Sequence, residues 1–130
     1  MLEPSQFKDN EAWVAFQLND EPIRTEHDGH FNCIALMDAA SGFIFGTGLV
    51  SVAEQEPSTF EARRLLKASL ERSGCTPATL FIPEGQLQVA LPAEAKRHGI
   101  AVVFLHETEL LTFTGEAKQG FREHVQGGRA

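Results

Sequence analysis

Asp38-Ala39-Ala40-Ser41-Gly42 is the stretch that decides the fold of this chain. It separates two apolar segments, residues 31–37 and residues 43–52, which are rich in Phe, Ile and Val. A short polar turn between two such segments is typical of a β-hairpin. Because aspartate commonly opens a turn, we expect the Asp38 carboxylate to accept hydrogen bonds from the backbone amides of Ala40 or Ser41.

Three further apolar segments predict strands on either side of this hairpin. Residues 12–18 form a strand before it, and the charged connection over residues 19–30 leads into the hairpin. Residues 79–82 and 101–105 form two strands after it. The last of these, Ala-Val-Val-Phe-Leu, has the unbroken apolar pattern of a fully buried parallel strand.

Helical segments separate the later strands. Ser58 and Glu61 form a capping box that begins one helix, and Gly74 ends it. Residues 86–98 predict a second helix, which Pro92 must either start or kink. A third helix begins at about Thr108.

The predicted order is β-β-β-α-β-α-β-α. Three antiparallel strands followed by right-handed parallel crossovers make one mixed five-stranded α/β sheet, with strand order 3-2-1-4-5 and helices on its faces. The apolar periodicity predicts the following core residues: Trp13, Phe16, Ile34, Leu36, Ile44, Leu65, Leu66, Leu80, Ile82, Val102, Val103 and Phe104.

This order, with Trp13 opening the first strand, the turn at residues 38–42 and Gly99-Ile100 before the last strand, resembles the ribonuclease H-like superfamily. Within it, the chain resembles a degenerate transposase or integrase catalytic core and bacterial domains of that type. Active members hold two divalent metal ions with carboxylates for phosphoryl transfer. The resemblance places the first-strand carboxylate at Ala15 or Phe16, and the second at Pro83.

These substitutions predict a catalytically inactive domain that needs no cofactor and acts as a binding or protein-interaction module. The alternative is a nuclease or transposase-related enzyme that uses magnesium or manganese. Its candidate ligands are Asp20, Glu84 and either Glu107 or Glu109. Asp38 is not among them, because it ends a strand antiparallel to the first and so lies at the opposite edge of the sheet.

Two other groups of side chains have the right chemistry for a site. His27, His30 and Cys33 include zinc-ligand types, although no second pair lies nearby in sequence. Three basic side chains of the first helix are candidates for nucleic-acid contact: Arg63, Arg64 and Lys67. Glutamates interleave with them, which is typical of a solvated helix face.

The composition sets the remaining limits. With 130 residues and a formal charge of −7, the chain is one domain whose average field repels nucleic acid. We expect a flexible segment over residues 1–11, a single domain over residues 12–126 and a frayed tail over residues 127–130. No segment resembles a secretion signal or a membrane span, so we expect a cytoplasmic protein without a membrane partner.

The second arm of the hairpin also predicts a partner. Phe43, Phe45 and Leu49 alternate along this arm, which we place at a sheet edge. Unpaired sheet edges attract further strands. We therefore expect either a homodimer through the hairpin edge or a protein partner that the sequence does not identify.

Overall fold

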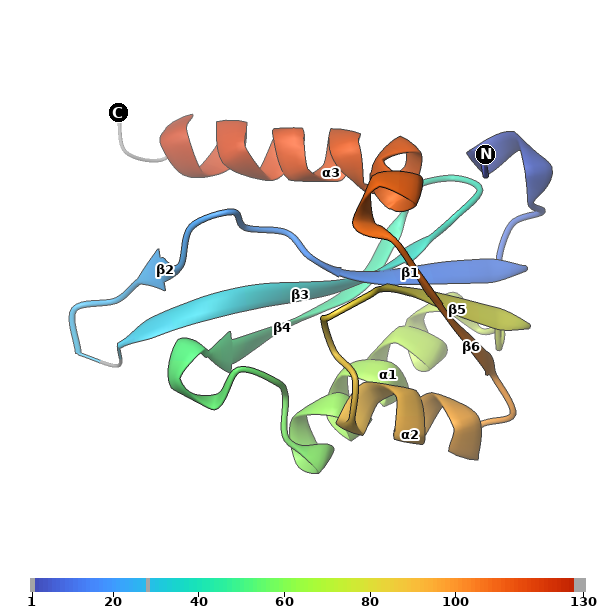
Figure 1. The fold of residues 1–130 in the computed structure, drawn as a ribbon, viewed down its shortest axis with the longest axis horizontal. Helices are drawn as coiled ribbons and strands as arrows, with labels where there is room; N and C mark the ends of the chain where they lie inside the picture. The colour runs from blue at the N-terminus through green and yellow to red at the C-terminus, as the bar shows by residue number, and fades with distance from the viewer. Residues whose placement is uncertain (1, 28, 128–130) are drawn as a thin grey trace.

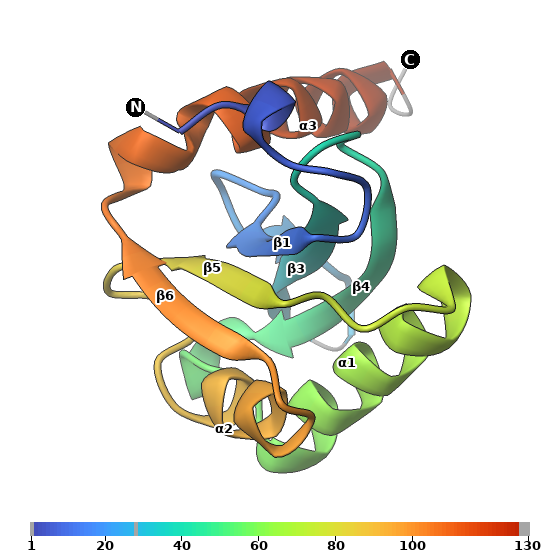
Figure 2. The same ribbon diagram turned by 90° about the vertical axis from the view of Figure 1, so that its right-hand side faces the viewer.

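The computed structural model describes residues 2–27 and 29–127, with side chains as far as residue 124. A mixed six-stranded sheet lies between α1 and α2 on one face and α3 on the other (Figures 1 and 2). The elements, in chain order, are η1 (Pro4–Gln6), β1 (Ala12–Gln17), β2 (Ile23–Arg24), β3 (His30–Asp38), β4 (Ile44–Ser51), η2 (Val52–Glu54), α1 (Thr59–Ser73), β5 (Thr79–Pro83), α2 (Ala90–Arg97), β6 (Ala101–Leu105) and α3 (Glu107–Gly127).

The sheet has the predicted topology. β1 is central, antiparallel to β3 and parallel to β5, while β4 and β6 lie at the two edges. This arrangement confirms the ribonuclease H-like fold and the order 3-2-1-4-5 of the five predicted strands. The sixth strand, β2, is a two-residue strand within the connection over residues 19–30, and it pairs with the start of β3.

Two hydrophobic clusters bury the two faces of the sheet. The first core cluster packs Trp13 and Ala15 of β1 against α1 and α2, together with Leu66 and Leu91. The second core cluster packs the alternate β1 residues, including Phe16, against α3. Because side chains alternate along a strand, a central strand covered on both faces must be apolar throughout, which explains the sequence Ala-Trp-Val-Ala-Phe.

Local signals set the helix boundaries. The capping box at Ser58 and Glu61 is formed, and Gly74 ends α1 in the left-handed conformation, with φ of 71°. Pro92 is the third residue of α2, within the first turn, where its missing N–H has no intrahelical partner to lose.

The prediction that residues 101–105 form a fully buried strand is wrong. β6 is parallel to β5 as expected, but Val103 and Phe104 are 38% and 37% exposed. An edge strand has only one strand neighbour, and Val102 and Leu105 are the β6 side chains that pack against the two clusters. Ile44, also predicted as core, is partly buried against the second cluster.

A bulge changes the side-chain phase of β4. Leu36 lies opposite Gly46 and Met37 opposite Ile44, so Phe45 is the extra residue. Phe45 packs against Trp13 with ring centroids 5.0 Å apart, on the same face as Val50. Leu49, adjacent to Val50, therefore points to the opposite face, and the predicted alternation of Phe43, Phe45 and Leu49 is interrupted.

The segment that contains η1 lies on the same side of the sheet as α3 (Figure 2). The segment before β1, predicted to be flexible, contains η1, and its residues Leu2 and Phe7 pack against the second core cluster. Of the predicted frayed tail, Gly127 ends α3 and residues 128–130 lie outside the described part. None of the helices within the described residues has the length and hydropathy needed to cross a membrane.

Candidate functional site

The positions where the resemblance places two catalytic carboxylates hold side chains without oxygen. Ala15 is fully buried in the first core cluster, and Phe16 is buried in the second, on the other face of β1. At the end of β5, Pro83 is buried. Glu84 follows it with an exposed side chain, and its backbone N–H donates to the Leu105 carbonyl at 2.8 Å.

Asp38 is a turn-capping residue, as predicted. Its carboxylate accepts hydrogen bonds from the backbone N–H of Ser41 at 3.1 Å and from Ser41 Oγ at 2.6 Å. It also accepts the backbone N–H of Asn10 at 2.9 Å, a contact the sequence did not predict. Asp38 lies opposite Trp13 at the start of β1, whereas Glu84 follows the far end of β5. The two carboxylates therefore lie at opposite ends of the strands, Asp38 where β1 and β5 begin and Glu84 where β5 ends.

The alternative carboxylate set is not assembled either. Asp20 pairs with Arg122 at 3.3 Å, and Glu107 pairs with Lys118 at 3.2 Å. Glu109 is an exposed residue in the first turn of α3. Among the residues that the structure describes, no three His, Cys, Asp or Glu side chains are grouped closely enough to hold a metal ion.

The candidate zinc ligands do not form a metal-binding group either. His27 and His30 are exposed, and His27 lies 3.9 Å from the Glu26 carboxylate. Cys33 is buried in the second core cluster. Burial raises the pKa of the Cys33 thiol, which disfavours the thiolate that zinc requires.

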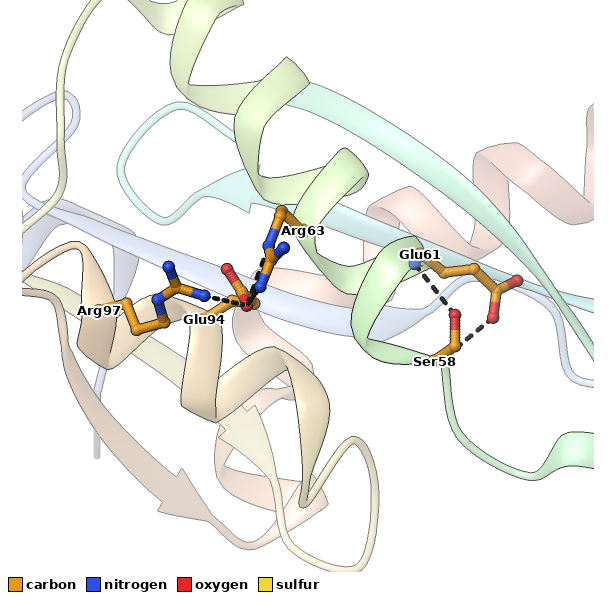
Figure 3. A network of polar contacts seen from close by, with 5 residues as sticks. All are labelled: Ser58, Glu61, Arg63, Glu94 and Arg97. Atoms are coloured by element: carbon orange, nitrogen blue, oxygen red, sulfur yellow. Dashed lines mark hydrogen bonds and ion pairs between the residues drawn. The ribbon is translucent and has the colours of Figure 1, made fainter.

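The basic residues of α1 differ from one another. Arg64 and Lys67 are exposed, but Arg63 donates to the buried carboxylate of Glu94, with Nη2 3.0 Å from Oε1 (Figure 3). Arg97 lies 3.3 Å from the same oxygen. The hydrogen bond from Arg63 holds the pKa of Glu94 below its ordinary value. Arg63 therefore joins α1 to α2 instead of presenting a free cation to nucleic acid.

A pocket of about 270 Å³ lies where the end of β1 meets the connection that follows β5. Gln17, which lines it, is two residues beyond Ala15 and so projects from the same face of β1. The opposite wall begins at Gly85, two residues after Pro83. Its apolar floor is formed by core residues, including Ile34 and Val50.

The polar lining of this pocket is dominated by amide side chains: Gln17, Asn32, Gln55, Gln86 and Gln88. The one ionisable lining residue is Glu56, whose Oε1 accepts the backbone N–H of Val89 at 2.9 Å. That bond ties the segment before α1 to the segment before α2, 33 residues later.

Sequence analysis missed this site. Its amides come from β1, β3 and two connections, and no motif places them together. The available signal was the presence of Gln17 and Asn32 among the apolar residues of two buried strands. Gln86 and Gln88, which flank a buried leucine, added to it. Polar groups among buried residues need partners, and the partner that Gln17 and Asn32 share, Asn19, lies 13 residues from Asn32 in sequence.

Comparison with known proteins identifies the fold. The sequence matches no protein-family model and no curated protein sequence. A chain in the cryo-electron microscopy structure of the simian T-cell lymphotropic virus intasome, in complex with PP2A regulatory subunit B56 gamma, has a TM-score of 0.58 and 12% identity. The match covers 91% of this chain and 37% of that one, so our chain spans well under half of its length.

The HTLV-2 integrase catalytic core domain, solved with magnesium in a dimeric form, has a TM-score of 0.54 and 11% identity. This match covers 84% of our chain and 82% of the integrase core. Together with the strand order, these similarities show that the chain has the ribonuclease H-like fold of a retroviral integrase catalytic core.

Proposed function

We propose that this domain is a catalytically inactive relative of the integrase core in architecture, and that it acts as a binding or protein-interaction module. The observation that carries the proposal is the identity of the side chains at the two strand positions, Ala15 or Phe16 and Pro83. In-line phosphoryl transfer by two metal ions needs oxygen ligands on both the attacking and the leaving side. A methyl group, a phenyl ring or a pyrrolidine ring provides none.

The packing around these positions supports the same conclusion. Ala15 and Ile82 belong to the first core cluster, so apolar side chains surround the place where the first-strand ligand would lie. Introducing a carboxylate there would bury a charge, which costs several kcal/mol without a paired cation. The local core is thus suited to close packing and poorly suited to metal coordination.

A nuclease assay tests the proposal. Purified protein is incubated with plasmid DNA, single-stranded DNA and RNA in magnesium or manganese buffer, and manganese binding is followed by electron paramagnetic resonance. We expect neither cleavage nor binding. The Glu84→Gln variant serves as the control, because a contaminating nuclease would survive this substitution. Cleavage that disappears in Glu84→Gln would refute the proposal and favour the metal-dependent enzyme with Asp20 and Glu107 or Glu109.

Homodimerisation through the hairpin edge is part of the same proposal. β4 pairs with β3 on one side, and the described residues place no strand on its other side. Phe43 and Leu49 are about half exposed on this arm, and the Arg72 guanidinium lies 5.4 Å from the centre of the Phe43 ring. We expect sedimentation velocity to show a dimer that Leu49→Lys dissociates. A particle of 14.3 kDa at every concentration would remove this part of the proposal.

We also propose a cytoplasmic location. Cys33 and Cys75 are both free thiols, one buried and one exposed. An exposed free thiol is typical of a reducing compartment. Fractionation of the producing cells would test this proposal, and recovery of the protein outside the cytoplasm would contradict it.

A further inference from the structure

We propose that the pocket beside Gln17 binds the carboxamide of an asparagine or glutamine side chain presented by a partner protein. This inference rests on the proposed binding role and names the chemistry of the partner. Gln17 at the end of β1 lines the pocket on one side, and the connection from β5 to α2 lines it on another. Figure 1 shows this connection and the one from β4 to α1 on the same side of the sheet.

A buried asparagine orients two of the polar side chains that line the pocket. Asn19 is almost fully buried, and its Oδ1 accepts the backbone N–H of Cys33 at 2.7 Å. Its Nδ2 donates to Asn32 Oδ1 at 2.9 Å. Gln17 Nε2 in turn donates to the Asn19 carbonyl at 2.8 Å.

These bonds leave a defined pair of free groups. Within the described residues no hydrogen bond uses Asn32 Nδ2 or Gln17 Oε1, so these two atoms remain as a donor and an acceptor. One fixed donor and one fixed acceptor match the carbonyl and the NH₂ of a carboxamide. A carboxylate would match the donor but would face the Gln17 oxygen without a proton to donate.

The rim adds adaptable amides to this fixed pair. Gln55, Gln86 and Gln88 line the pocket, and their side chains make no hydrogen bond to any part of the chain that the structure describes. Free amides at a pocket mouth can bond the peptide backbone of a ligand on either side of its inserted side chain, because each offers both a donor and an acceptor.

Two residues that line the pocket also have an unusual backbone conformation. Three non-glycine residues within the described part have positive φ, and two of them, Gln55 at 64° and Leu87 at 48°, line this pocket. Such conformations are strained and are concentrated at binding and catalytic sites. The bond from Val89 N–H to Glu56 holds the two strained segments together.

Charge and apolar exposure favour a peptide over a nucleic acid. Glu56 is the single ionisable residue of the lining, and the chain carries a formal charge of −7, so phosphate is repelled. Val89 next to the rim is 69% exposed, and Phe60 in the first turn of α1 is 70% exposed. Exposed apolar residues beside a polar pocket provide contact area for the residues that flank an inserted side chain.

Titration followed by two-dimensional ¹⁵N–¹H NMR tests the assignment. The probe is N-acetylglutamine N-methylamide, and the matched control ligand is N-acetylglutamate N-methylamide at neutral pH, which differs by one amide-to-carboxylate change. We expect side-chain amide shifts at Gln17, Asn32, Gln86 and Gln88 with the first ligand, and affinity at least tenfold weaker for the second.

Two variants locate the binding. Asn32→Asp keeps the oxygen that accepts from Asn19 but replaces the pocket donor with a charged acceptor, so we expect at least tenfold weaker binding of the glutamine probe. Gln88→Glu, an exposed rim change that cannot unfold the core, should weaken binding severalfold. Gln6→Glu is the matched control on the other face of the sheet, because it keeps the oxygen that accepts the Glu3 N–H. It should bind the probe as the unmodified protein does.

Three outcomes overturn the proposal. These are no shift with the glutamine probe, equal affinity for both probes, or binding of free adenine in place of the amide, which would indicate a nucleobase pocket. None of them decides the nuclease question, since cleavage is measured separately. Failure of the glutamine probe would overturn only the pocket proposal, whereas nuclease activity would overturn the proposed function.

Discussion

Gly46→Ala tests how closely α1 packs against the sheet. Gly46 lies on the bulged part of β4, facing α1, and its φ lies outside the positive range, so alanine suits its backbone. A Cβ at this position would overlap Ser69 Oγ and lie 3.4 Å from Leu65 Cδ1. Ser69 is fully buried, and within the described residues its hydroxyl has no hydrogen-bond partner.

The expected magnitude follows from this overlap. Overpacking a closed core costs about 1–3 kcal/mol. Replacing glycine also removes freedom from the unfolded chain, which offsets about 0.4–1 kcal/mol of that cost. We expect Gly46→Ala to lower the free energy of unfolding by roughly 1–2 kcal/mol. Ser69→Ala removes the overlapping, unpartnered oxygen and should be neutral or stabilising by about 1 kcal/mol, because a buried hydroxyl without a partner is costly.

Urea denaturation of the single and double variants measures these effects. In the double variant the new Cβ meets the Cβ at position 69 at 3.6 Å, an ordinary contact, so its stability should approach that of Ser69→Ala alone. Gly48→Ala is the matched control, because its Cβ would meet Leu65 no closer than 3.9 Å. If Gly46→Ala were as stable as Gly48→Ala, or the double variant showed no rescue, this account of the packing of α1 on β4 would be wrong.

Three further predictions concern the polar contacts that hold the fold. Ser58→Ala removes the hydroxyl that accepts the Glu61 N–H at 3.1 Å and should cost about 1 kcal/mol in urea unfolding. Asp38→Ala removes a buried acceptor of three hydrogen bonds and should cost about 2 kcal/mol, seen as a lower urea midpoint with an unchanged slope. Glu94→Gln should lower the thermal midpoint at pH 7, whereas Glu71→Gln on the exposed side of α1 should not. The folded-state pKa of Glu94 is depressed, so its contribution is present above the unfolded pKa and is lost as pH falls through the folded pKa. The difference from the unmodified protein should therefore vanish on acidification, and a difference that persists unchanged at low pH would contradict the ion-pair explanation.

The sheet order could be predicted because its signals are local or nearly so. The turn at residues 38–42 joins neighbouring strands, and the capping box at Ser58 marks the first crossover helix. The continuous apolar sequence of β1 requires cover on both faces, which places it at the centre. Right-handed crossovers then leave few alternatives for the two later strands.

The sequence could not predict in the same way which β6 side chains are exposed, or on which face of the sheet each β4 side chain lies. Ala-Val-Val-Phe-Leu is as apolar as a central strand, but its burial depends on how far the helices extend over the sheet edge. The bulge at Phe45 adds one residue to one strand of a pair, and period-2 reasoning assumes that no such residue exists. Both errors arise from tertiary packing that overrides a local pattern.

Only part of the candidate site could be predicted from the sequence. The resemblance places the first-strand position at Ala15 or Phe16 and the second at Pro83, and the strand order that defines these positions could be predicted from the sequence. The amide pocket could not be predicted, because its donor and acceptor pair depends on which atoms of Gln17 and Asn32 the buried Asn19 already occupies.

The pocket lies where connections from distant parts of the chain meet. In a parallel arrangement such as β1 with β5, the connections leaving the strand ends converge at one edge of the sheet, and side chains there come from distant parts of the sequence. Gln17 lies at the end of β1 and Gln86 and Gln88 follow β5, so uncharged donors and acceptors line the pocket here. Asn19, itself buried, holds Gln17 and Asn32 through hydrogen bonds of 2.8 and 2.9 Å. Uncharged donors and acceptors of this kind suit the proposed recognition of a neutral carboxamide.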